Sequence, residues 1–175
     1  MKKFTNTKTY EFIYNGKEHQ RNVKEIDISS NDVETIKNNL SKVSKTGIYF
    51  FVLKGDFMLS YSNFYSETTG IFFKEGCPYT VEFTPHLNIK ENEKNSYMLE
   101  KDFVAYIGRA ENFTKRISEH LFGDKINGTA SLKLGLKSRE PIKKYLKLLI
   151  VEGSITEYKD MENSARNQYG SYFGK

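Results

Sequence analysis

The sequence predicts an α+β fold (α/β in the broader sense), with a central, mostly antiparallel β-sheet flanked by helices. Three observations predict it: alternating residues around an Asn-Gly turn, short apolar runs rich in aromatic residues, and segments whose apolar residues recur at helical spacing. Aromatic residues make up 14% of the 175 residues, without any tryptophan. Aromatic side chains pack well on pleated surfaces, which suits a β-containing core.

A hairpin followed by a helix is predicted at the N-terminus. Alternating aromatic residues precede Asn15-Gly16, a dipeptide that tolerates the positive φ angles of a tight turn. In the next stretch, Asn31 and Glu34 have the spacing of a capping box at the start of a helix. The apolar residues that follow lie on one face of that helix: Val33, Ile36, Leu40 and Val43.

The middle of the chain predicts two strands separated by an insertion. The run "TGIYFFVLKGD" is typical of a buried strand that ends at Gly55-Asp56. Residues 57 to 100 contain further strand-like pieces between glycine, proline and polar segments, and are predicted to form an inserted β region. Residues 102 to 107 predict another strand, which breaks at glycine, and residues from about 111 to 121 predict a helix.

The last third of the chain predicts a strand and a closing helix. By pattern alone "IKKYLKLLIVEG" fits a helix or a strand, and its Leu-Leu-Ile-Val run before Gly153 favours the strand. A final helix is predicted with Thr156 as its cap and an end near Gly170. We expect residues 1 to 175 to form a single domain, with residues 1 to 45 as an N-terminal extension.

Composition narrows the class of protein. The formal charge of +5 and the pI of about 9.1 favour a polyanionic partner, since lysines and arginines that neutralise phosphates release counterions. The single cysteine, Cys77, excludes an internal disulfide and a multi-cysteine zinc cluster. Neither a secretory signal nor an apolar run of membrane-spanning length is evident, so we expect a cytoplasmic protein that does not enter the membrane.

One ordered set of residues resembles a known family. "GIY" at residues 47 to 49 and "YIG" at residues 106 to 108 are similar to the two motif strands of the GIY-YIG nuclease superfamily. An arginine lies ten residues past Tyr106, a histidine follows one helical turn later, and a glutamate lies on the last predicted helix. The resemblance covers residues 46 to 55 and 102 to 175. It implies these site residues: Tyr49, Tyr106, Arg116, His120 and Glu162.

The chemistry of these residues agrees with what the resemblance implies. Arg116 and His120 are four residues apart, so they share one face of a helix. Arginine offers forked donors for a phosphate, and histidine can move a proton near neutral pH. By resemblance Glu162 is the metal ligand, and its carboxylate suits a hard cation, Mg²⁺ or Mn²⁺. Tyr49 is, by resemblance, the residue that accepts the proton of an attacking water, directly or through a neighbour; His120 is the alternative base.

Each residue also has an ordinary structural explanation. The two tyrosines could be core aromatics of strands, and Arg116 could belong to a solvated helix face. His120 could be a satisfied structural histidine, and Glu162 could favour the dipole of its helix from the first turn. The functional interpretation depends on all five occurring in the family's order.

The chain departs from the family's pattern in two places. A short hairpin normally links the two motifs, whereas 56 residues separate Tyr49 from Tyr106 here. "TGIFF", with Phe72 at the tyrosine position, is an alternative first motif that lacks the hydroxyl. Where the family has a terminal asparagine region, this chain has "YGSYFGK".

The resemblance implies a divalent-metal-dependent endonuclease that hydrolyses DNA phosphodiester bonds, most similar to a stand-alone, restriction-type enzyme. RNA is not excluded as a substrate, and a repair or RNA-directed nuclease remains an alternative. A second hypothesis is a non-catalytic nucleic-acid-binding module on the same fold. Residues 57 to 100 would contact DNA, pair with a second subunit in a homodimer, or simply extend the sheet.

Overall fold

The structure, a computed structural model, describes residues 9–28, 32–53, 98–99, 102–122 and 146–169. Three predictions concern residues outside these ranges. They are the strand-like pieces between residues 57 and 97, the alternative motif at Phe72, and the end of the last helix near Gly170.

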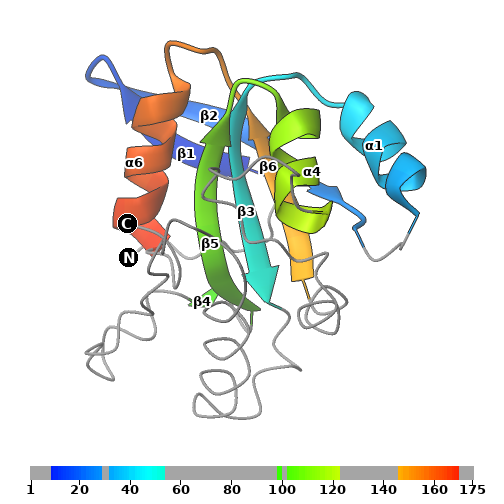
Figure 1. The fold of residues 1–175 in the computed structure, drawn as a ribbon. Coiled ribbons are helices and arrows are strands. Elements are labelled where there is room, and N and C mark those ends of the chain that lie inside the picture. Colours follow the sequence, from blue (N-terminus) through cyan, green and yellow to red (C-terminus); the bar gives the residue numbers. More distant parts are fainter. Residues whose placement is uncertain (1–8, 29–31, 54–97, 100–101, 123–145, 170–175) are drawn as a thin grey trace, which may run out of the picture.

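Six strands form one sheet in the order β1-β2-β6-β3-β5-β4, and every pair in it is antiparallel. The strands are β1 (Thr9–Tyr14), β2 (Lys17–Ile26), β3 (Gly47–Leu53), β4 (Met98–Leu99), β5 (Asp102–Ala110) and β6 (Leu146–Glu152). The helices are α1 (Val33–Ser41), α4 (Phe113–Phe122) and α6 (Tyr158–Tyr169), with α1 and α4 to one side of the sheet and α6 to the other (Figure 1). The predicted α+β class is confirmed. Among the described helices, none has the length and hydrophobicity needed to cross a bilayer.

The N-terminal hairpin and helix occur as predicted. Asn15 and Gly16 have φ angles of 49° and 72°, and they join β1 to β2 where Tyr14 pairs with Lys17. Positive φ at both central residues matches the right-handed twist of the flanking strands, which is why Asn-Gly is favoured there.

The sheet separates two apolar layers. Side chains alternate along a strand, so Tyr49 and Phe51 of β3 lie on one face, while Ile48 and Phe50 lie on the other. The first layer includes the buried residues of α1 and α4, and the second includes those of α6 and β1. Because β3 is covered on both faces, its sequence is a continuous apolar run instead of an alternating one.

The predicted cap of α1 is wrong by one residue. Asp32, not Asn31, caps α1, because its carboxylate accepts from the backbone N–H groups of Glu34 and Thr35. Thr156, the predicted cap of the last helix, lies in a turn just ahead of α6. The Glu157 carboxylate accepts from both the backbone N–H and the hydroxyl of Ser154, and these bonds close the turn that leads into α6.

Two strands settle the remaining predictions. β6 pairs with both β2 and β3, so the ambiguous "KLLIV" segment is a strand, as predicted. The sequence suggested that this strand breaks at Gly108, but β5 continues to Ala110, which pairs with Gly47. A glycine interrupts a strand only where pairing fails, and here the pairing with β3 continues on both sides of Gly108.

Candidate active site

The two motif strands are neighbours in the sheet. β3 and β5 pair antiparallel, and Tyr49 lies opposite Gly108 of the second motif. The 56 residues between the two tyrosines therefore do not prevent the strand pairing that the motifs require.

The motif glycines make room for close contacts. A Cβ atom at Gly108 would lie 2.5 Å from Cζ of Tyr49 and 2.8 Å from Cε1 of Tyr106, so the Tyr49 ring rests directly on the β5 backbone. Gly47 has a φ of 145°, and a Cβ there would overlap the carbonyl oxygen of Val151. Only glycine combines that backbone angle with that approach.

We expect Gly108→Ala to displace Tyr49. The added methyl group overpacks a buried layer, so the free energy of unfolding should fall by about 1–3 kcal/mol, measured by urea denaturation. Gly16→Ala is the comparison: its Cβ would meet open space, and its φ of 72° adds only local strain in the turn. Both variants should be destabilised, but only Gly108→Ala should also lose any activity that depends on Tyr49. Equal stability of Gly108→Ala and wild type would contradict the packing described here.

Four of the five predicted residues meet on the α4 face of the sheet. Tyr49 Oη lies 2.7 Å from Nε2 of His120, and the same hydroxyl hydrogen-bonds to the Arg116 guanidinium and the Tyr106 hydroxyl. The rings of Tyr49 and Tyr106 stack at a centroid distance of 6.0 Å, and the His120 ring lies 5.2 Å from that of Tyr106. Arg116 also pairs with Glu119 at 2.8 Å. We call Tyr49, Tyr106, Arg116 and His120 the tetrad.

The tetrad is largely buried. Tyr49 and His120 have no exposed surface, and Tyr106 is 8% exposed. The Arg116 side chain is 23% exposed and is the member most accessible to solvent. A ligand from solvent would therefore meet Arg116 first, and the Tyr49 hydroxyl lies behind it.

His120 does not titrate near neutral pH, contrary to the prediction. Burial lowers the pKa of His120 well below its usual value, and the Arg116 charge acts in the same direction. The imidazole is therefore neutral at physiological pH. Its Nε2 atom can then accept a hydrogen bond, while Nδ1 carries the proton.

The Tyr49 hydroxyl is also neutral. Burial raises the pKa of Tyr49 well above its usual value, and Tyr106 adds to the rise, whereas Arg116 lowers it. The Arg116 charge favours the ionised phenol, but burial disfavours it more strongly. Because Arg116 can only donate, the Tyr49 oxygen accepts from Arg116, and when Nδ1 carries the proton of His120 the Tyr49 hydroxyl donates to Nε2.

The buried neutral histidine predicts a pH dependence of stability. The unfolded chain binds a proton at His120 below about pH 6.5, while the folded protein does not, so stability should fall as the pH drops below that value. For each pH unit by which the pH falls, one extra proton bound by the unfolded state lowers the free energy of unfolding by up to about 1.4 kcal/mol. Urea unfolding of His120→Asn between pH 7.5 and 5.5 should show a shallower dependence than wild type. Equal slopes for His120→Asn and wild type would contradict a neutral buried His120.

Glu162 lies on the other face of the sheet. It belongs to α6, whose buried residues pack in the second layer, and β5 runs between α6 and α4 (Figure 1). Glu162 Oε2 accepts from Arg109 at 2.8 Å, and Oε1 accepts from Arg166 at 3.1 Å. The structure thus brings four predicted site residues together and places Glu162 apart from them, in an ion-pair cluster with two arginines.

Sequence reasoning missed both arginines. Arg109 immediately follows the second motif, and strand alternation turns it to the face opposite Tyr106. Arg166 is four residues after Glu162 on one helix face, which is the spacing of a helical ion pair. That spacing was the signal available in the sequence. Arg166 also donates to the carbonyl oxygen of Ile107 at 2.7 Å, which connects α6 to β5.

The residues partly fit the divalent cation that the resemblance implies. In the described part of the chain, no three carboxylate, histidine or cysteine side chains gather as a cation site. Mg²⁺ usually keeps several waters and is bound through one or two carboxylates together with substrate phosphates. Glu162 is suited to such a shared site but not to a complete protein cage, and both of its oxygens accept from arginines in this structure.

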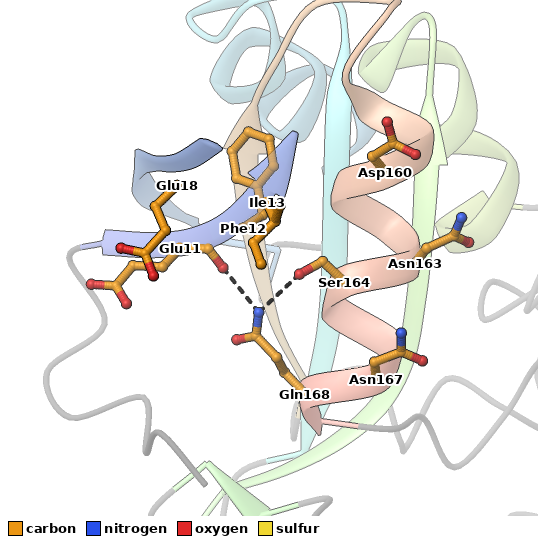
Figure 2. Close-up of a pocket in the computed structure, with 9 residues that line it drawn as sticks. All are labelled: Glu11, Phe12, Ile13, Glu18, Asp160, Asn163, Ser164, Asn167 and Gln168. Atoms are coloured by element: carbon orange, nitrogen blue, oxygen red, sulfur yellow. Dashed lines mark hydrogen bonds between the residues drawn. The ribbon is translucent and has the colours of Figure 1, made fainter. Parts of the chain in front are cut away.

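A separate groove lies between the hairpin and α6 (Figure 2). It has a volume of about 560 Å³ and contains none of the predicted site residues. The Gln168 side chain crosses it and donates to the Glu11 carbonyl at 3.0 Å and to the Ser164 hydroxyl at 2.9 Å. Three carboxylates line this groove, so it would repel a phosphate: Glu11, Glu18 and Asp160.

Comparisons with models of known protein families, with curated proteins and with solved structures give no match. The family resemblance therefore rests on the motifs and on the geometry described above.

Proposed function

We propose that the protein is a divalent-metal-dependent endonuclease that hydrolyses phosphodiester bonds of DNA, of the restriction type. The observation that carries this proposal is that His120 and Arg116 both contact the hydroxyl of Tyr49, with His120 Nε2 at 2.7 Å from it. The two strands that carry the motifs are paired at this point. A proton acceptor, a hydroxyl and a permanent cation around one oxygen are the parts of a general-base relay next to a phosphate site.

In this proposal the chain moves a proton through Tyr49. Water attacks phosphorus, one P–O bond of the diester breaks, and the leaving oxygen takes a proton from solvent. The water's proton passes to the Tyr49 oxygen while the phenolic proton passes to Nε2 of His120. The high pKa of Tyr49 is then less of an obstacle, because the phenol gains one proton as it loses another and does not have to ionise first. A phosphate anion bound at Arg116 would offset the charge that lowers the pKa of His120, making the imidazole a better base when substrate is present.

Arg116 is the group that would hold the phosphate. Burial disfavours its charge, yet Tyr49 and Glu119 raise its pKa above the usual value, so it stays protonated. In this proposal Glu162 would hold Mg²⁺ or Mn²⁺ on the α6 face of the sheet, opposite the tetrad, and that cation would supply neutralisation of developing charge.

The second candidate is a nucleic-acid-binding module without turnover. The burial of Tyr49 and His120 and the position of Glu162 across the sheet favour it, because a binding module needs neither an accessible base nor a cation. Under this alternative the tetrad is a buried polar network that fixes α4 on the sheet, and Arg116 alone contacts phosphate.

A cleavage assay on a mixed panel of DNA and RNA separates the two candidates. The purified protein would be incubated with each substrate in Mg²⁺, in Mn²⁺ and in chelator, and the product ends would be sequenced. We expect cation-dependent cleavage of DNA. Binding to DNA without cleavage in either cation would favour the binding module, and cleavage confined to RNA would reassign the substrate.

We expect Glu162→Gln to abolish cation-dependent cleavage while the protein still binds DNA. The amide keeps the shape of the side chain but lacks the charge that a hard cation requires. Glu157→Gln is a matched control, because the Glu157 carboxylate also pairs with an arginine, Arg21, at 2.9 Å. Both variants should lose a similar, small amount of stability, but only Glu162→Gln should lose cleavage. Wild-type cleavage by Glu162→Gln would remove this residue from the proposed cation site.

A further inference from the structure

The outermost strand, β1, has one edge that no other described strand covers. Within the part of the chain that the structure describes, β1 pairs only with β2. Tyr14 and Lys17 flank the two-residue turn, so they are the first hydrogen-bonded pair of the β1–β2 ladder. Hydrogen-bonded and non-hydrogen-bonded pairs alternate, so the backbone N–H and C=O groups of Glu11 and Ile13 point away from β2. These groups lie along the outer edge of the sheet.

The groove between the hairpin and α6 follows this edge. Phe12 packs in the apolar layer of α6, whereas Glu11 and Ile13 alternate with it and lie on the other face of β1. All three residues line the groove. A groove bordered by both faces of one strand must run along the edge of that strand. The Ile13 side chain, 62% exposed, is available there for an apolar contact.

A side chain already hydrogen-bonds to this edge in the manner of a neighbouring strand. Nε2 of Gln168 donates to the Glu11 carbonyl at 3.0 Å (Figure 2). A backbone N–H of an added strand would make the same bond. Because the donor is a side chain that can rotate to another position, the Glu11 carbonyl can change partners while β1 stays paired with β2.

The charge of the groove selects the kind of partner. Glu18 and Asp160 are exposed, and neither forms an ion pair within the described residues. Glu11 adds a third carboxylate, and no lysine or arginine is among the described residues that line the groove. Pairing of β1 with β1 of a second copy would bring these carboxylates together, and like charges on neighbouring strands are destabilising. A segment that carries lysines or arginines would be attracted instead.

We propose that β1 binds an extended, basic segment of a partner protein, which adds to the sheet as a further strand. The backbone of that segment replaces Gln168 at the Glu11 carbonyl and pairs with Ile13, while its cationic side chains contact Glu18 and Asp160. Main-chain hydrogen bonds provide the affinity of such an added strand, and the side chains provide its specificity. The groove contains no member of the tetrad, so this inference does not depend on the proposed nuclease function.

The first test uses a defined peptide as the probe. Fluorescein-labelled Lys-Lys-Val-Val-Lys-Lys-Thr-Thr carries two lysines on each face when extended, and its binding to the full chain would be measured by fluorescence anisotropy. We expect saturable binding, and none when glutamate replaces every lysine. Glu18→Gln/Asp160→Asn should bind about fivefold more weakly, the scale of two exposed charge pairs. Glu25→Gln/Glu34→Gln removes the same charge from β2 and from the first turn of α1, outside the groove, and should bind like wild type.

The second test addresses the strand edge. Ile13→Pro removes the outward N–H but no bond to β2, so β1 should stay paired, which urea denaturation would check. Its affinity for the peptide should fall about tenfold, the scale of one lost backbone hydrogen bond that leaves its partner unsatisfied. Ile13→Val keeps the N–H and should bind like wild type. In wild type, hydrogen exchange followed by nuclear magnetic resonance should slow at the Ile13 amide when the peptide binds.

Four results would overturn the proposal. They are no saturable binding of the lysine peptide, equal binding of the glutamate peptide, equal affinities of Glu18→Gln/Asp160→Asn and its control, and an Ile13 amide whose exchange is unaffected by the peptide. Sedimentation of the protein alone covers the remaining occupant. A concentration-dependent dimer that is lost in Ile13→Pro but kept in Ile13→Val would assign the edge to a second copy of this chain and would also overturn the proposal.

Discussion

Arg116→Ala is expected to reduce single-turnover DNA cleavage by about 10²- to 10³-fold, the loss typical of removing one donor that stabilises developing charge. The guanidinium hydrogen-bonds to the Tyr49 hydroxyl and is the most accessible member of the tetrad, so it lies where a phosphate would enter. Its contact should strengthen as negative charge builds on the phosphate, which affects the rate more than the affinity for substrate. Quench-flow cleavage and equilibrium DNA binding, measured on the same preparation, separate the two effects.

Arg116→Lys provides the conservative comparison. Lysine keeps the charge but lacks the planar fork that can donate to a phosphate and to Tyr49 together, so an intermediate rate is expected. Arg21→Ala, which breaks an ion pair in the hairpin region, should leave the cleavage rate unchanged. If Arg116→Ala weakens binding but cleaves at the wild-type rate once saturated, the arginine only positions the substrate.

Tyr49→Phe and His120→Ala should each slow single-turnover cleavage by about a hundredfold or more, the usual contribution of general acid–base catalysis. Under the proposed relay, Tyr49→Phe removes the hydroxyl that would take the proton of the attacking water, and His120→Ala removes its hydrogen-bond partner at 2.7 Å. Because the two residues act in one relay, the double variant should be little slower than either single variant.

Tyr10→Phe is a matched control for Tyr49→Phe. Tyr10 is equally buried, and its hydroxyl donates to the Met161 carbonyl at 2.7 Å. Both substitutions should lower the free energy of unfolding, by about 1 kcal/mol for each hydrogen bond lost, and Tyr49→Phe loses more of them. Only Tyr49→Phe should slow cleavage. A Tyr49→Phe protein that cleaves at the wild-type rate from about pH 6 to 10, the range between the reference pKa values of histidine and tyrosine, would remove Tyr49 from the chemistry.

The elements that the sequence predicted are those specified by local patterns. Asn15-Gly16 requires only its own two φ angles, and the face shared by Arg116 and His120 follows from helical spacing. The cap of α1 was harder to predict, because Asn31 and Asp32 are neighbours and both residue types cap helices well. The strand break expected at Gly108 was wrong because the reason for that glycine, the Tyr49 ring above it, lies on another strand.

The candidate site depends on tertiary packing more than the individual helices and strands do. Nothing local to α6 specifies which face of the sheet it covers, so the sequence could not place Glu162 relative to Tyr49. The pKa of His120 was expected near neutrality, since burial and the Arg116 charge arise only when α4 packs on the sheet. The pairing of Arg109 with Glu162 joins residues 53 positions apart, beyond the reach of any local pattern.

Cleavage of supercoiled plasmid by wild type and Arg116→Ala, purified in parallel, tests the central claim most directly, because a contaminating nuclease would appear in both preparations. We predict that wild type converts the plasmid to nicked or linear DNA in Mg²⁺ but not in chelator, and that Arg116→Ala leaves it supercoiled under both conditions. An uncut plasmid with wild type in Mg²⁺ and in Mn²⁺, or equal cleavage by the two proteins, would contradict the assignment of the tetrad as a nuclease active site.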